Sequence, residues 1–81
     1  METETIEHKI ERLRKKAEIL RDNNIKSFVK DYYLNYHFCF IEEVTSNWII
    51  VEGFKGQRKG ESTRIFWSDV YDIQEYKEDL E

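Results

Sequence analysis

The spacing of apolar residues changes at Ile25, and this change constrains the fold more than any other feature of the chain. Before it, apolar residues recur every three or four positions, as on one face of a helix (Ile6, Ile10, Leu13, Ala17 and Leu20). After it, the pattern shifts towards alternation and is rich in aromatic and β-branched types, as in strands. We therefore expect a mainly β (α+β) fold in which an N-terminal helix precedes a β domain.

The helix is predicted over residues 1–24, where no glycine or proline interrupts the pattern. Thr3 or Thr5 can cap its first turn, and Asn23-Asn24 suits the left-handed conformation that ends a helix. Its apolar stripe fits either a short coiled coil or a face docked on the rest of the fold. Both alternatives stay open from the sequence.

Residues 25–77 are predicted to form about five short strands joined by tight connections. The expected strands lie within 25–33, 36–44, 48–54 and 64–76, with turns at 34–35 and 45–47 and a loop at 55–63. Asn35 is expected to take the positive φ of the first turn. Such strands most economically close into a small, strongly bent barrel, which removes exposed edges, although an open sheet with a helix on one face is the alternative. A charged tail at 78–81 completes a single domain.

Two segments resemble motifs of the Sm/Lsm family of small β-barrels. The first, "YHFCFIEEVTSNWIIVE" at 36–52, has an alternating strand, a turn, and Asn47 followed by three apolar residues and then an acid. The second, "IFWSDVYDI" at 65–73, keeps the apolar frame of the second motif. The resemblance implies a five-stranded Sm-like or SH3-like barrel that assembles into a homo-oligomeric ring. It also implies that "FWSD" is a strand running into a tight turn.

The resemblance suggests a nucleic-acid site but departs from the family within it. In Sm proteins that bind RNA, the motif asparagine contacts a base and an Arg-Gly pair supplies a cationic clamp; here Asn47 persists, while Phe66 and Trp67 replace Arg-Gly. The replacement removes the guanidinium that best pairs with phosphate or stacks on a base. Because neighbouring strand residues point to opposite faces, one of Phe66 and Trp67 is expected in the core and the other in a subunit interface or stacked on bases. The family's strand glycine is also missing, with Phe38 near its place, which predicts a gentler bend.

Positive charge is confined to one segment of an otherwise acidic chain. The formal net charge is −4, yet residues 55–66 carry Lys55, Arg58, Lys59 and Arg64 against Glu61 alone. These four side chains are either phosphate contacts or a solvated loop. If RNA or another single-stranded nucleic acid binds, we expect it to contact these four together with Asn47 and Trp48 of the 45–48 loop. The alternative for Asn47 is a turn asparagine that bonds its own backbone.

The remaining residues predict neither catalysis nor a cofactor. Cys39 is the only cysteine, and with His37 it supplies only half of a metal site, so no metal or disulfide is expected. No motif positions a nucleophile or a phosphate loop, so neither an enzyme nor a small-molecule substrate is expected. The start "METETIEHKI" lacks the order of a signal peptide, and no apolar run reaches the ~20 residues of a membrane span, so a cytoplasmic protein is expected. Two functions follow: an Sm-like protein that binds single-stranded nucleic acid, or an Sm-like assembly module that has lost the RNA pocket.

Overall fold

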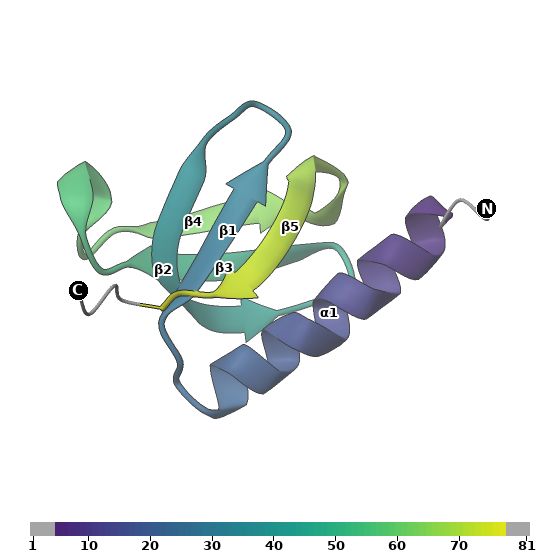
Figure 1. Cartoon of the computed structure of the whole chain (residues 1–81), viewed down its shortest axis with the longest axis horizontal. Helices are drawn as coiled ribbons and strands as arrows, with labels where there is room; N and C mark the ends of the chain where they lie inside the picture. The colour runs from purple at the N-terminus through teal and green to yellow at the C-terminus, as the bar shows by residue number, and fades with distance from the viewer. Residues whose placement is uncertain (1–4, 78–81) are drawn as a thin grey trace.

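The computed structural model describes residues 5–77, which form one helix and one five-stranded antiparallel sheet (Figure 1). The elements are helix α1 (Ile6–Asp22), strands β1 (Ser27–Asp31), β2 (Tyr36–Val44), β3 (Trp48–Gly53), β4 (Ser62–Phe66) and β5 (Val70–Glu75), and 3-10 turns η1 (Gly56–Arg58) and η2 (Trp67–Asp69). The predicted helix and the predicted number of strands are confirmed. The tail at 78–81 lies outside the described residues.

Helix α1 begins and ends at the predicted signals. The side chain of Thr5 accepts a hydrogen bond from the backbone N–H of His8 at 3.1 Å, which satisfies one of the free amides of the first turn. Thr3, the other predicted cap, lies outside the described residues. At the far end, Asn23 caps the helix and Asn24 takes a positive φ of 53°.

The apolar stripe of α1 docks on the chain's own sheet, which decides between the two alternatives above. Leu13, Ala17 and Leu20 are buried in the same core as residues of all five strands, and Ile10 packs against it. Ile6, one turn further towards the N-terminus, is 59% exposed and lies beyond the docked surface. The helix contacts chiefly β2 and β5.

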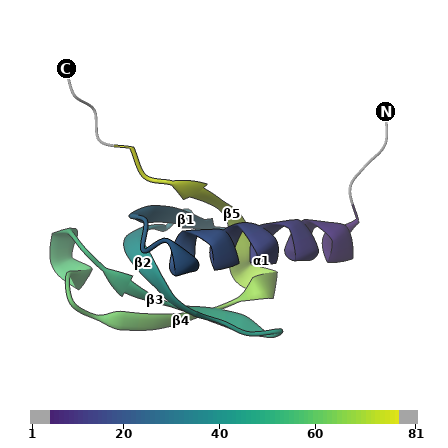
Figure 2. The ribbon, with the colours of Figure 1, turned by 90° about the horizontal axis from the view of Figure 1, so that it is seen from below.

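The sheet is bent but not closed, so the expected closed barrel is wrong. The strand order is β4-β3-β2-β1-β5, which leaves β4 and β5 as the two edges. Figure 2 shows β1 with β5 in one layer and β3 with β4 in the other, while α1 runs along the opening between them. Turn η2 directs the chain away from β4, and the buried side chain of Trp67 in this turn belongs to the core. The helix and this indole therefore cover apolar surface that strand closure would otherwise bury.

The bend in β2 comes from a bulge rather than from a glycine. The pairing of β2 with β3 shifts register between Ile41 and Glu43, so that two residues of β2 face one of β3. A bulge of this kind increases the local twist and bends the strand. The bulge therefore bends the strand without the family's strand glycine, whose absence predicted a gentler bend.

Two of the turns predicted from the sequence differ in outcome. At the β1–β2 turn, Leu34 takes the positive φ of 68°, not Asn35 as predicted. The reason is that Asn35 binds the Asp31 carboxylate through both its backbone N–H (2.9 Å) and its side-chain amide (3.3 Å), which holds it in place. At "FWSD", β4 ends at Phe66 and η2 follows, so the predicted strand and tight turn are confirmed.

Candidate nucleic-acid interface

The turn between β2 and β3 is organised by Thr45. Its hydroxyl accepts hydrogen bonds from the backbone N–H groups of Asn47 (3.2 Å) and Trp48 (2.9 Å). The carbonyl oxygen of Asn47 accepts from the backbone N–H of Trp67 at 3.1 Å. The backbone of Asn47 is therefore held in place while the residue itself is exposed.

Strand pairing brings Trp48 together with two residues of β4. Trp48 lies opposite Phe66, and their rings are 5.8 Å apart at 83°. The guanidinium carbon of Arg64 lies 5.0 Å from the Trp48 ring centre and 5.4 Å from that of Phe66, within cation–π range of both. We call Trp48, Arg64 and Phe66 the tryptophan cluster. Within residues 5–77, Trp48 Nε1 is buried and has no hydrogen-bond partner.

The neighbouring aromatics Phe66 and Trp67 separate as predicted. Phe66 is 42% exposed, whereas Trp67 is 3% exposed, which confirms that one is core and the other is surface. The indole N–H of Trp67 donates to the carbonyl oxygen of Thr45 at 2.8 Å. Because Trp67 is buried, it cannot stack on a base or meet a neighbouring subunit. Of the two residues, only Phe66 is exposed enough to do either.

The four basic side chains predicted to act together are divided among three places. Arg58 and Lys59 are exposed at the tip of the β3–β4 hairpin. Arg64 is in the middle of β4, opposite Ile50 of β3, and its guanidinium lies in the tryptophan cluster rather than at the tip. Lys55 turns away from both, because its Nζ lies 4.7 Å from the Phe38 ring centre and 3.2 Å from the Tyr76 hydroxyl.

The sequence analysis missed a set of packed aromatic rings on the outer side of the sheet. Each ring centre lies between 5.3 and 5.7 Å from the next. We call this set the aromatic face, and in order of contact it consists of Tyr36, Phe28, Phe38, Tyr76, Phe54 and Phe40. The sequence signal for this set lies in β2, where apolar residues occupy both alternating sets of positions, so both sides of the strand are apolar. Of this strand, only Cys39 and Ile41 are buried in the core, and the other apolar set lies on the outer side.

A buried carboxylate holds the β1–β2 turn. Asp31 is 7% exposed and accepts hydrogen bonds from the backbone of Tyr33 (2.8 Å) and from Asn35, and its Oδ2 lies 3.2 Å from His37 Nε2. Burial raises the pKa of Asp31, but the hydrogen bonds from Asn35, His37 and Tyr33 lower it by more, so the pKa lies below its ordinary value. This network is structural, since it fixes the turn.

His37 and Cys39 do not extend into a metal site within the described part of the chain, where no three His, Cys, Asp or Glu side chains gather. The Cys39 thiol donates to the carbonyl oxygen of its neighbour His37 at 3.4 Å. Burial raises the pKa of Cys39 to about 12, so the thiol is held in its unreactive neutral form.

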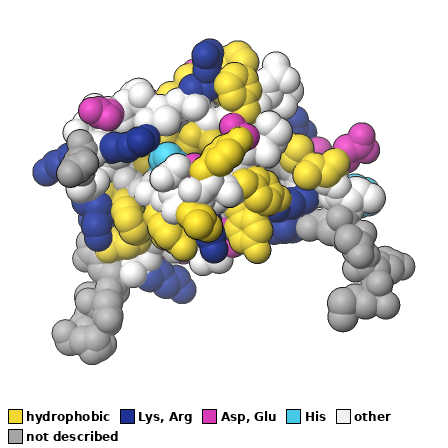
Figure 3. All heavy atoms as spheres, turned by 90° about the horizontal axis from the view of Figure 1, so that it is seen from above, with side chains coloured by type: hydrophobic (Ala, Val, Ile, Leu, Met, Phe, Trp, Pro, Cys, Tyr) yellow, Lys and Arg dark blue, Asp and Glu magenta, His cyan; other side chains and the backbone are white. Residues whose placement is uncertain are grey.

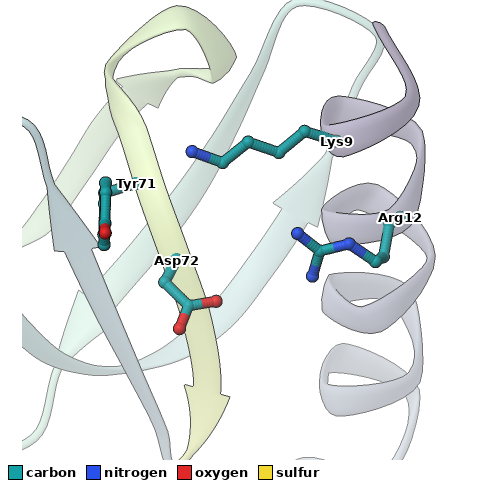
Figure 4. A pocket seen from close by; sticks show the side chains of 4 residues that line it. All are labelled: Lys9, Arg12, Tyr71 and Asp72. Atoms are coloured by element: carbon teal, nitrogen blue, oxygen red, sulfur yellow. The ribbon is translucent and has the colours of Figure 1, made fainter. Parts of the chain in front are cut away.

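A hollow of about 380 Å³ lies between α1 and β5, lined by Lys9, Arg12, Tyr71 and Asp72 (Figure 4). Figure 4 shows Asp72 turned towards Arg12 and the Lys9 side chain extended from α1 towards β5, where its Nζ lies 4.7 Å from the Tyr71 ring centre. The Asp72 carboxylate accepts hydrogen bonds from the Ile73 N–H (2.9 Å) and the Gln74 side chain (2.8 Å).

Comparison with known proteins assigns no family. No family model matches the chain, and no curated protein or solved structure matches it. Among residues 5–77, the helix is too short and too polar to cross a bilayer.

Proposed function

We propose that the protein is an Sm-like, self-assembling protein that binds single-stranded RNA or DNA through the tryptophan cluster. The observation that carries this proposal is the position of Arg64. The second motif of the family supplies its cation from the residue after the first isoleucine, which is Phe66 here. Arg64 precedes that isoleucine, yet its guanidinium lies over Trp48 and Phe66.

The geometry of the cluster suits a base and a phosphate together. An exposed aromatic ring offers a face on which a base can stack, and an arginine beside it offers paired donors for phosphate. Asn47, whose turn is held by Thr45, lies directly before Trp48 in the chain.

Fluorescence anisotropy with labelled oligouridine and with a mixed-sequence DNA strand tests the proposal. We expect binding at low salt that weakens steeply as salt rises, because phosphate contacts release counterions. Arg64→Gln and Phe66→Leu should each weaken it strongly, whereas Arg58→Gln, an exposed change of the same charge in the hairpin tip, should weaken it less. Equal losses from Arg58→Gln and Arg64→Gln would contradict a site centred on the tryptophan cluster.

A second function is favoured by the two open edges of the sheet. Strands β4 and β5 end the strand order, and antiparallel pairing of β4 with β5 of a neighbour would continue the sheet from one copy to the next. An assembly module needs these edges but not the tryptophan cluster. Light scattering after size-exclusion chromatography that shows an oligomer, together with no binding of either oligonucleotide at low salt, would favour this second function over the first.

A further inference from the structure

We propose that a continuous track of aromatic rings and lysines on the outer side of the sheet binds single-stranded nucleic acid at a place distinct from the tryptophan cluster. The track extends the aromatic face by two tyrosines. Its members are the six rings of that face with Tyr32 and Tyr71, and the lysines Lys9, Lys26, Lys30 and Lys55.

Lysines connect the aromatic face to the two added tyrosines. The Nζ of Lys30 lies 5.6 Å from the Tyr36 ring centre and 4.9 Å from that of Tyr71. The Nζ of Lys9, from α1, lies 4.7 Å from the ring centres of both Tyr32 and Tyr71. The helix, β1, β2 and β5 therefore all contribute to one end of the track.

The other end of the track repeats this arrangement. The Nζ of Lys55 lies 4.7 Å from the Phe38 ring centre and 5.1 Å from that of Tyr76. The Nζ of Lys26 lies 5.3 Å from the Phe54 ring centre. Each of the four lysines thus places its charge next to the flat side of an aromatic ring, which attracts a cation.

Part of this surface is open to a ligand. Tyr32, Tyr36 and Tyr71 are each about half exposed, at 47%, 50% and 47%. Figure 3 shows hydrophobic side chains gathered on the side viewed from above, with Lys and Arg side chains beside them. Clustered exposed aromatics on a soluble protein mark a binding surface more often than isolated ones do.

The charge of the track contrasts with that of the whole chain. The chain has a formal net charge of −4, yet four lysines gather along these rings. Asp72 lies opposite Lys30 in the β1–β5 pairing. Its carboxylate is turned towards α1 (Figure 4) and accepts a hydrogen bond from the side chain of Gln74, which lies opposite Phe28. Glu52 lies opposite Phe40, at one end of the track. The partner expected on such a surface is therefore an anion.

Single-stranded nucleic acid fits this surface because it carries flat bases and phosphates together. Aromatic side chains stack on bases irrespective of sequence, and lysines beside them contact the backbone. A protein partner with an acidic, apolar surface would use the same charges but has no bases to stack. The proposed ligand is therefore nucleic acid; failure of the oligonucleotide to bind at low salt would instead favour an acidic protein.

Two triple variants that lose the same charge test this inference. The probe is a fluorescein-labelled oligouridine of about twelve nucleotides, within the range of site sizes for single-strand binding folds. The track variant carries Lys9→Gln, Lys30→Gln and Lys55→Gln; the matched control carries Lys15→Gln, Arg58→Gln and Lys59→Gln, which are exposed and lie outside both sites. Arg64→Gln alone reports on the tryptophan cluster. We expect the track variant to lose at least about tenfold in affinity, and the slope of log affinity against log salt to fall by roughly 2, since each lost contact to a single strand removes about 0.7.

A change of ring without a change of charge completes the design. Tyr36→Ala should weaken binding by about tenfold, because it removes a stacking surface and leaves every lysine in place. Thermal melting identifies any variant that has unfolded, and Tyr71→Ala replaces Tyr36→Ala if the latter has.

The outcomes distinguish this inference from the proposed function. Loss in the track variant with retention in the control supports the track, and Arg64→Gln shows separately whether the tryptophan cluster also binds. Equal losses in the track variant and the control would mean that binding follows total charge and would overturn the track. If the track variant and both tyrosine variants bind like the unchanged protein while Arg64→Gln loses affinity, the lysines only shield the rings from water and the inference is overturned. If the unchanged protein binds no oligonucleotide at low salt, the inference and the proposed function are both wrong.

Discussion

The indole N–H of Trp67 donates a 2.8 Å hydrogen bond to the carbonyl oxygen of Thr45, which joins the turn after β4 to the turn between β2 and β3. Trp67 is also buried in the core. The same turn is held by the Trp67 backbone N–H, which donates to Asn47. Trp67 therefore fixes the turn that directly precedes Trp48 of the tryptophan cluster.

Trp67→Phe should destabilise the protein far more than Trp48→Phe. The first change leaves the Thr45 carbonyl oxygen without its partner and opens a space in the core, at a cost of about 2–4 kcal/mol. The second removes an N–H that has no partner within residues 5–77 and shortens a ring that is only partly buried, so its cost should stay near ~1 kcal/mol or less. Urea denaturation followed by circular dichroism measures both. Equal costs would show that the Trp67 hydrogen bond adds nothing to stability.

Leu13→Ala should lower the free energy of unfolding by about 2–5 kcal/mol, because Leu13 is fully buried under the sheet. Ile19→Ala is the matched control: it lies on the same helix and is 60% exposed, so it should change stability by about 0.5 kcal/mol or less. Thermal and urea denaturation give both values. A small effect at Leu13 would mean that α1 does not dock in solution.

The stability of the protein should fall in acid, partly through Asp31. The pKa of Asp31 is lowered in the folded state, so the unfolded state takes up this proton first as the pH falls. The stabilisation is therefore present above about pH 4, the ordinary pKa of aspartate, and is lost as the pH falls through the lower folded value. Asp31→Asn should reduce the pH dependence by at most about 1.4 kcal/mol per pH unit. Urea denaturation at pH values from about 2 to about 6, the range in which carboxylates titrate, measures this pH dependence of stability. Identical pH profiles for Asp31→Asn and the unchanged protein would count against the assigned network.

Cys39 should resist thiol reagents while the protein is folded. Its side chain is buried, and its raised pKa leaves almost no thiolate at neutral pH. A thiol-reactive dye should label it rapidly in concentrated urea and only slowly in buffer, at a rate limited by unfolding. Rapid labelling of the native protein would mean that β2 opens locally.

Proline substitutions in β4 should distinguish edge pairing from folding. The backbone N–H of Trp67 donates to Asn47, and that of Gly53 donates to Glu61. In an antiparallel pair, hydrogen-bonded and non-hydrogen-bonded residues alternate between such bonds. The N–H of Thr63 therefore faces β3, and the N–H of Ser62 faces the open edge. Ser62→Pro removes an edge donor at the first residue of the strand, which a strand tolerates. We expect it to dissociate any assembly built on β4 and leave a folded monomer.

Thr63→Pro is the control for this experiment, because it breaks the ladder to β3 and should destabilise the fold itself. Light scattering reports the mass, and circular dichroism reports the fold. An oligomer unchanged by Ser62→Pro would rule out pairing at this part of the β4 edge.

Local features of the sequence determined the secondary structure well. The bounds of β2 and the signals at both ends of α1 follow from period, caps and turn residues, which act between neighbours along the chain. The turn at "FWSD" is confirmed for the same reason. The positive φ at 34 was misplaced, because the Asp31 side chain binds Asn35 across the turn and this contact overrides the intrinsic preference of asparagine.

The tertiary structure decided which surfaces meet. Alternation along a strand shows that Phe66 and Trp67 face opposite ways, but only packing against the core decides that Trp67 is buried. The register of β3 against β4 places Arg64 over Trp48, and the fold carries Lys55 to Phe38 and away from its sequence neighbours Arg58 and Lys59. Sequence patterns report the face on which a side chain lies, whereas its partners depend on strand pairings between distant segments, which only the folded chain specifies.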